Sequence, residues 1–91
     1  MSHKNKSIEV VVGVMRNDNN EIFITRRQID QFMSGYWELP GGKVENKESH
    51  SNAIMRELYE ETGVTVKNHH LIQTIEHQYP QKTINLSVFS I

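Results

Sequence analysis

The sequence predicts an α+β fold in which a mixed β-sheet carries one functional helix. Residues 8–15 are β-branched and apolar, and residues 83–91 alternate between apolar and polar side chains, so both stretches are predicted as strands. Between them, residues 49–62 have the apolar spacing of a helix. The 91 residues, 1–91, are expected to form a single domain with a thin core, which a metal ion or a partner subunit could stabilise.

The N-terminal part is expected to form a β-hairpin after a polar, disordered segment over residues 1–6. Residues 8–15 are the first strand, residues 16–20 are a dense turn signal, and residues 21–25 resume the strand pattern. Residues 28–35 show no periodicity and are therefore predicted as a loop.

A short extended segment over residues 36–39 is ended by Pro40. Because Pro40 fixes its φ angle while Gly41 and Gly42 are permissive, these three residues are predicted to be irregular backbone. The carbonyl or N–H groups of Gly41 and Gly42 could approach a metal ion or a phosphate closely.

The helix over residues 49–62 has a signal at each end. Ser49 can cap its N-terminus, and Gly63 stands where a left-handed C-terminal cap belongs. One face carries an apolar stripe formed by Ala53, Ile54 and Leu58.

The C-terminal part is predicted to be extended. Residues 64–66 and 71–75 have strand character, and residues 79–82 are a turn. Because the chain stops within the alternating pattern of residues 83–91, we expect the domain to be incomplete at its C-terminus. The last strand would then be exposed, and two copies could pair through it. Its apolar face consists of Ile84, Leu86 and Val88.

Composition excludes several classes of protein. The absence of Cys rules out disulfide scaffolds, thiolate zinc sites and cysteine nucleophiles. A formal net charge of -1 argues against a broad surface for nucleic-acid polymers. No apolar run is long enough to span a bilayer, and the polar start lacks the apolar stretch of a secretory signal. We therefore expect a cytoplasmic protein with no membrane or nucleic-acid partner.

Three carboxylates at helical spacing are the clearest chemical signal. Glu57, Glu60 and Glu61 lie at i, i+3 and i+4 and would project from one helix face. Oxygen ligands of this kind suit Mg²⁺, which keeps room for the phosphates of a substrate. The alternative is a solvated acidic face. Glu48 and Arg56 could pair and fix the preceding loop to the helix, or form an ordinary surface pair.

The spacing of these residues resembles the Nudix box, G-x5-E-x7-R-E-U-x-E-E-x-G-U, where U is aliphatic. Every fixed position of that motif is matched, which makes the signal strong. The matching residues are Gly42, Glu48, Arg56, Glu57, Leu58, Glu60, Glu61, Gly63 and Val64.

The resemblance extends to the MutT-like branch of this family through residues 12–14, 16–27 and 37–43. It implies a Nudix-type mixed sheet in an α/β/α sandwich, whose second helix would be missing here. It also implies Mg²⁺- or Mn²⁺-dependent hydrolysis of oxidised purine nucleoside triphosphates such as 8-oxo-dGTP, giving the monophosphate and pyrophosphate. Another nucleoside diphosphate-linked compound, such as ADP-ribose, is the alternative substrate.

The resemblance also implies roles for individual residues. Glu48 with Arg56 would orient the helix, and Glu57 is the candidate base among the box residues. The metal ligands would be Glu57, Glu60, Glu61 and the carbonyl group of Gly42. The substrate-binding residues would be Arg27, which would meet a phosphate, together with Phe32, Glu38 and Lys43.

Several of these residues also have plainer interpretations. Phe32 could fill the core as well as contact a ligand, Lys43 could be solvated, and Trp37 is expected to pack rather than to stack on a base. In addition, Leu39 replaces the aromatic residue that the family has before Pro-Gly-Gly, which removes one surface for purine stacking. A truncated, inactive domain that binds metal or nucleotide is the second functional hypothesis, and a domain that dimerises through its last strand is the third.

Overall fold

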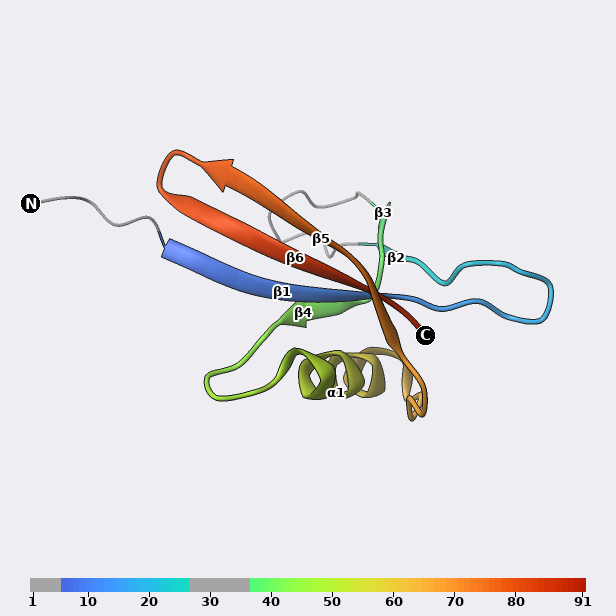
Figure 1. Ribbon diagram of the computed structural model, residues 1–91. Helices are drawn as coiled ribbons and strands as arrows, with labels where there is room; N and C mark the ends of the chain where they lie inside the picture. Colours follow the sequence, from blue (N-terminus) through green and yellow to red (C-terminus); the bar gives the residue numbers. More distant parts are fainter. Residues whose placement is uncertain (1–5, 27–36) are drawn as a thin grey trace, which may run out of the picture.

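The computed structural model describes residues 6–26 and 37–91. Four strands form one sheet in the order β4-β1-β6-β5, and β2 and β3 form a small second sheet. Figure 1 shows α1 beside β4 and β1, with the β5–β6 hairpin extending away from the helix. A mixed sheet with one helix confirms the predicted fold class. In chain order the elements are β1 (Lys6–Val14), β2 (Thr25–Arg26), β3 (Trp37–Glu38), β4 (Gly41–Lys43), α1 (His50–Thr62), β5 (His70–Tyr79) and β6 (Lys82–Ser90).

The last strand, β6, lies inside the sheet. It runs parallel to β1 along that strand's whole length, from Lys6 opposite Lys82 to Val14 opposite Ser90. Its other edge pairs antiparallel with β5, so β4 and β5 occupy the two edges of the described sheet. The expectation of an exposed last strand is therefore wrong, because both rows of β6 backbone groups are already engaged. Dimerisation through that strand loses its structural basis.

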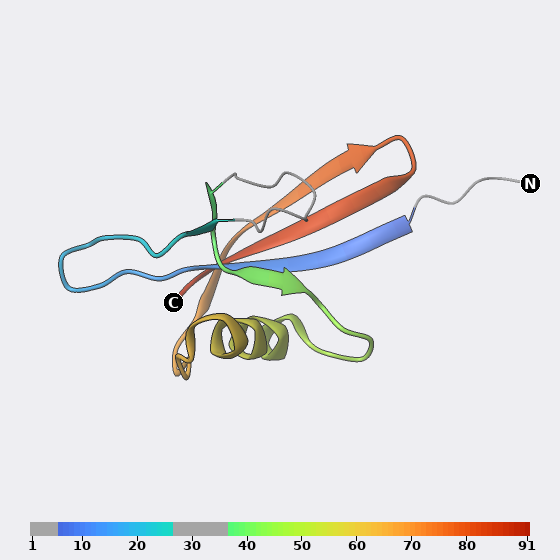
Figure 2. The same cartoon turned by 180° about the vertical axis from the view of Figure 1, so that it is seen from behind.

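The predicted N-terminal hairpin is confirmed at its turn, but its second strand does not continue along β1. Between β1 and β2 the chain makes a long arm, seen in Figure 2, with a single isolated bridge between Arg16 and Ile22. β2 then pairs with β3 instead of with β1. The side chain of Asn17 stabilises the turn itself, because its Oδ1 accepts the N–H groups of Asn19 and Glu21 at 2.9 Å each. Two backbone bonds join the sides of the arm, from the Asn17 N–H to the Glu21 carbonyl at 3.1 Å and from the Phe23 N–H to the Met15 carbonyl at 3.0 Å.

The helix begins and ends where the sequence predicts. The Ser49 side chain accepts the N–H of Asn52 at 3.0 Å, and Gly63 has a left-handed backbone with φ 76°. The N–H of Gly63 donates to the Tyr59 carbonyl at 2.8 Å, which satisfies one carbonyl of the last turn. Residues 1–5 of the segment expected to be disordered lie outside the described residues, and Lys6 is the first residue of β1.

The core lies between α1 and one face of the sheet. Residues alternate along β1 and β6, so Val11 and Phe89 face the helix, and Val66 packs with them although residues 64–66 join no strand. Gly13 permits this close approach, because a Cβ there would lie 3.1 Å from Cδ1 of Leu58. The buried apolar residues are Val11, Ala53, Ile54, Leu58, Val66 and Phe89.

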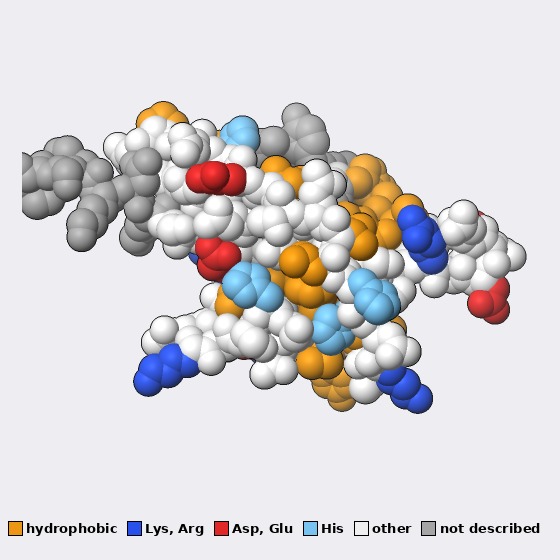
Figure 3. Space-filling view, in the orientation of Figure 1, with side chains coloured by type: hydrophobic (Ala, Val, Ile, Leu, Met, Phe, Trp, Pro, Cys, Tyr) orange, Lys and Arg blue, Asp and Glu red, His pale blue; other side chains and the backbone are white. Residues whose placement is uncertain are grey.

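The surface on the side of β5 is open. Every residue of β5 is exposed, and Figure 3 shows apolar and histidine side chains next to one another on this face. Trp37 of β3 is 62% exposed, so the expectation that it packs in the core is wrong. Within the described part of the chain, no helix combines the length and apolar character needed to cross a membrane.

Candidate active site

The site is built where strand β4 passes between β1 and α1. Gly41 and Gly42 belong to this strand, so the prediction of irregular backbone there is wrong. A Cβ at Gly41 would overlap the carbonyl oxygen of Val11, and a Cβ at Gly42 would overlap the Glu57 carboxyl group. The two glycines therefore allow β4 to pair with β1 on one side while a helix carboxylate lies directly against its backbone on the other.

Glu61 is the second helix carboxylate that contacts β4. Its Oε1 accepts the N–H of Gly41 at 3.1 Å. Burial raises the pKa of the Glu61 carboxyl group above its usual value, and the charges of Glu57, Glu38 and Glu60 raise it further, while the Gly41 bond acts in the opposite direction. The carboxylates of Glu57 and Glu61 thus both lie against the backbone of β4.

Arg56 connects the loop before α1 with this acidic helix face. Its Nε donates to Glu48 Oε2 at 2.7 Å and its Nη2 to Glu48 Oε1 at 3.0 Å. The same guanidinium donates from Nη1 to Glu57 at 2.9 Å and to Glu60 at 3.2 Å, and from Nη2 to the Lys43 carbonyl at 3.1 Å. One cation therefore holds three carboxylates and the end of β4 together.

Glu48 is fixed on both sides within its loop. Besides Arg56, its carboxylate accepts the N–H of Glu45 at 2.9 Å, and its own N–H donates to the Glu45 carbonyl at 3.0 Å. The Arg56 bonds, followed by the Glu45 N–H, lower the pKa of the Glu48 carboxyl group to about 2. Glu48 in turn raises the pKa of Arg56. The pair that the sequence suggests is therefore present and fully ionised at neutral pH.

A cavity lies next to the two glycines. Its volume is about 350 Å³, and it borders the opposite side of the β4 backbone from the Glu57 contact. Glu38, predicted to bind substrate, is one of its lining residues. No role was predicted for its apolar walls, because the register that pairs Val10 with Leu86 and puts both on one face of the sheet is set only in the folded chain. The full lining is Val10, Val12, Glu38, Leu39, Gly41, Gly42 and Leu86.

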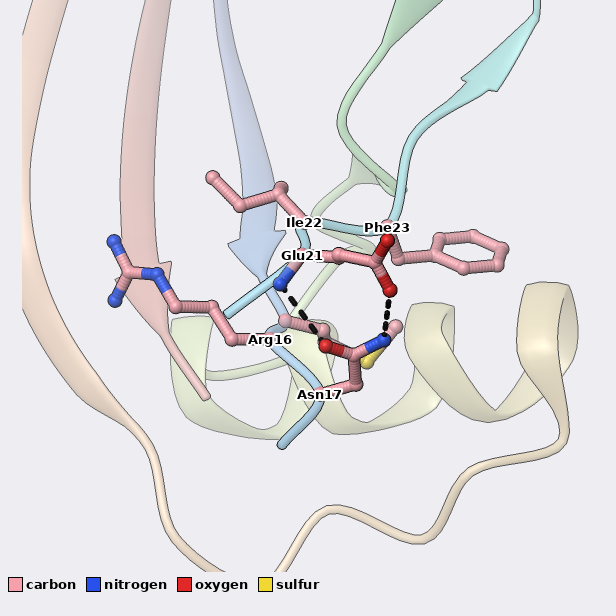
Figure 4. A pocket seen from close by; sticks show the side chains of 6 residues that line it. Arg16, Asn17, Glu21, Ile22 and Phe23 are labelled. Atoms are coloured by element: carbon pink, nitrogen blue, oxygen red, sulfur yellow. Dashed lines mark hydrogen bonds between the residues drawn. The ribbon is translucent and has the colours of Figure 1, made fainter. Parts of the chain in front are cut away.

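A larger cavity, of about 480 Å³, lies elsewhere, along the arm between β1 and β2. Figure 4 shows its lining, in which Asn17 and Glu21 are joined by two hydrogen bonds while Arg16 and Phe23 point in different directions. It shares no lining residue with the cavity beside β4. We therefore place the candidate site at β4, between the helix carboxylates that contact Gly41 and Gly42 and the smaller cavity that these glycines border.

Three further residues were predicted to bind substrate, and the structure describes only one of them, Lys43. Arg27 and Phe32 lie outside the described residues. Lys43 is exposed, and its backbone carbonyl accepts a hydrogen bond from Arg56.

The donor atoms at β4 and α1 suit a hard divalent cation. Carboxylate oxygens and a backbone carbonyl are the ligands that Mg²⁺ and Mn²⁺ take, and the missing Cβ of Gly42 leaves room for the Glu57 carboxylate at the β4 backbone. Over residues 6–26 and 37–91, however, no three acidic or His side chains are grouped as a metal site. The reason is visible in the contacts: Glu57 and Glu60 turn to Arg56, and Glu61 turns to Gly41.

Comparison with known proteins identifies the family. A model of the NUDIX domain matches residues 6–89. The chain belongs to the Nudix family. It is 44% identical over 81 residues to an 8-oxo-dGTP diphosphatase of Escherichia coli (strain K12), covering 89% of this chain and 63% of that protein. It is 38% identical over 86 residues to an 8-oxo-dGTP diphosphatase of Proteus vulgaris, covering 94% of this chain and 77% of that protein.

Solved structures support the same family. The crystal structure of a MutT protein from Methanosarcina mazei Go1 superposes on this Nudix domain with a TM-score of 0.88 at 31% identity, over 98% of this chain and 65% of that one. The chain thus spans 63% of the Escherichia coli relative's length and 65% of the Methanosarcina mazei chain. Nudix hydrolases generally use a divalent metal.

Proposed function

We propose that this protein is a Mg²⁺- or Mn²⁺-dependent Nudix hydrolase that converts a purine nucleoside triphosphate such as 8-oxo-dGTP to the monophosphate and pyrophosphate. The observation that carries the proposal is the contact of the acidic face of α1 with Gly41 and Gly42, directly beside an apolar cavity. The similarity to 8-oxo-dGTP diphosphatases of Escherichia coli and Proteus vulgaris supports the choice of substrate.

In this proposal the α1 carboxylates and the Gly42 carbonyl hold the cation. The donors are Glu57, Glu60 and Glu61 with the backbone of β4. A divalent cation in such a site neutralises charge that develops on a phosphoryl group and lowers the pKa of bound water. Arg56 and Glu48 keep the loop and the helix in register. Glu57, whose side chain is only 15% exposed, is the candidate base, because it lies closest to the β4 backbone.

The nucleoside is proposed to enter the cavity beside β4. Apolar walls from Val10, Val12 and Leu86 suit the faces of a purine, and Glu38 supplies a polar group at the wall. Arg27, Phe32 and Lys43 remain proposed substrate contacts from the family resemblance, with Arg27 assigned to a phosphate.

Release of nucleoside monophosphate tests this function. The purified chain would be incubated with Mg²⁺ and 8-oxo-dGTP, dGTP or ADP-ribose, each at several concentrations. The matched variants are Glu57→Gln in the site and Glu76→Gln on β5, where an exposed carboxylate carries no proposed role. We expect hydrolysis that favours 8-oxo-dGTP, that is lost in Glu57→Gln, and that is retained in Glu76→Gln.

Other outcomes would change the assignment. A preference for ADP-ribose would move the substrate to another nucleoside diphosphate-linked compound. No turnover by a folded chain would contradict the proposal and favour a domain that binds metal or nucleotide without hydrolysis.

A further inference from the structure

Glu9 of β1 contacts both ends of the loop over residues 44–49, which joins β4 to α1. At the near end, the N–H of Val44 donates to the Glu9 carbonyl oxygen at 2.9 Å. At the far end, Oε1 of Glu9 lies 3.0 Å from Nε2 of His50, the first residue of α1. One residue of the sheet therefore holds both ends of this loop at fixed positions.

The Glu9 carboxylate is itself held in place by β6. Asn85 lies opposite Glu9 in the parallel register, and its Nδ2 donates to Glu9 Oε2 at 2.6 Å. The same amide group donates to the Ser7 hydroxyl at 3.0 Å. The bond from Asn85, and then that from His50, lowers the pKa of the Glu9 carboxyl group. Glu9 is thus an ionised and oriented acceptor when it meets His50.

The loop held in this way carries Glu48. A displacement of its far end would move Glu48 relative to Arg56, because the loop is short and Ser49 and His50 follow Glu48 directly. Arg56 also contacts Glu57 and Glu60, so the displacement would reach the carboxylates that are proposed to hold the cation. The contacts form one chain from β6 through β1 to the acidic face of α1.

We propose that Glu9, supported by Asn85 and His50, is a positioning residue that holds the loop carrying Glu48 in register with Arg56. The proposal rests on the proposed function, since it assigns these residues to the same site. The Glu9–His50 pair is partly exposed, with side-chain exposures of 38% and 43%, so it contributes little to global stability. Loss of this pair is therefore expected to disorder the loop locally and not to unfold the domain.

The test compares His50→Leu, which removes the donor, with His50→Gln, whose amide can still donate to Glu9. His70→Leu, at an exposed histidine that begins β5, is the matched control. The first readout is hydrogen exchange of the Arg56 Nε–H, followed by NMR in the unliganded chain. We expect exchange about fivefold faster in His50→Leu, because the Glu48 acceptor becomes less ordered, and exchange close to wild type in the other two variants.

The second readout is steady-state hydrolysis of 8-oxo-dGTP. We expect kcat to fall about fivefold in His50→Leu at unchanged KM, with recovery in His50→Gln, because none of residues 44–49 is among the residues that line the cavity proposed for the nucleoside. Equal Arg56 exchange in wild type and His50→Leu would overturn the positioning role, as would a loss that His50→Gln does not recover. Absence of turnover in the wild-type chain would contradict the proposed function alone, since the exchange measurement does not depend on activity.

Discussion

Arg56 and Glu48, eight residues apart, are joined by two parallel hydrogen bonds of 2.7 and 3.0 Å. Because the same guanidinium also reaches Glu57 and Glu60, its charge offsets the repulsion that the helix carboxylates would otherwise experience. The third carboxylate, Glu61, is held separately by the backbone of β4. The acidic face is therefore organised by contacts within the chain, and each of these contacts can be tested.

The Glu48–Arg56 pair predicts a specific pH dependence of stability. The pKa of Glu48 falls from 4.5 to about 2 in the folded chain, so its contribution is fully present above pH 4.5 and is lost as the pH falls towards 2. Urea unfolding of wild type and Glu48→Gln between pH 2 and pH 6 measures this contribution. The difference between the two proteins should shrink towards low pH. A difference that stays constant across this range would contradict the assignment.

Gly42→Ala should damage activity far more than stability. The added Cβ would displace the Glu57 carboxylate from the β4 backbone, and we expect kcat to fall by about 100-fold. Gly63→Ala is the matched control, because its Cβ meets no atom within 4 Å but its φ of 76° is unfavourable for Ala. That variant should lose about 1 kcal/mol of unfolding free energy and keep its activity. Equal activities of the two variants would show that the Gly42–Glu57 contact is unimportant.

Glu61→Gln should raise the thermal midpoint at neutral pH while it lowers activity. A raised carboxyl pKa means that the folded chain carries the ionised group at a cost, and this cost grows as the pH rises above the usual value of 4.5. Gln removes the charge but can still accept the N–H of Gly41. Melting curves at pH 7 and pH 4 should show the gain at the higher pH. A stability loss at pH 7 would contradict the role of burial and neighbouring charges.

Leu58→Ala should destabilise the domain strongly. Leu58 is fully buried between α1 and the sheet, and such truncations cost about 2–5 kcal/mol. In a domain with a small core, this is a large share of the total unfolding free energy. Tyr59→Ala, at the next position but 60% exposed, should change stability by less than about 0.5 kcal/mol. Denaturant unfolding monitored by circular dichroism separates the two cases. Similar losses of unfolding free energy in the two variants would contradict the burial of Leu58 and the exposure of Tyr59.

Local signals predicted the helix and the ion pair between Glu48 and Arg56. Ser49 and Gly63 mark the ends of α1 because capping depends on residues within one turn, and the 3.6-residue period fixes which side chains share a face. The Glu48–Arg56 pair was likewise suggested by spacing, since eight residues place a loop carboxylate near the first turns of the helix. The side-chain roles beyond these contacts remain predictions.

Nonlocal features were not accessible in the same way. The position of β6 between β1 and β5 depends on pairing between segments far apart in the chain, which alternation alone does not specify. The pairing of β2 with β3 instead of with β1 is likewise nonlocal, whereas the turn before β2 follows from the local sequence. No sequence motif links Glu9, His50 and Asn85, because these residues come into contact only when β1, α1 and β6 assemble.

Calorimetric titration with Mn²⁺ tests the central claim that the α1 carboxylates form the cation site at Gly42. Wild type would be compared with the double variant Glu60→Gln/Glu61→Gln and with Glu76→Gln on the exposed strand β5. The account predicts saturable heat for wild type and Glu76→Gln, and its loss in the double variant, with all three proteins folded by circular dichroism. The same binding heat in the double variant as in wild type would contradict the claim.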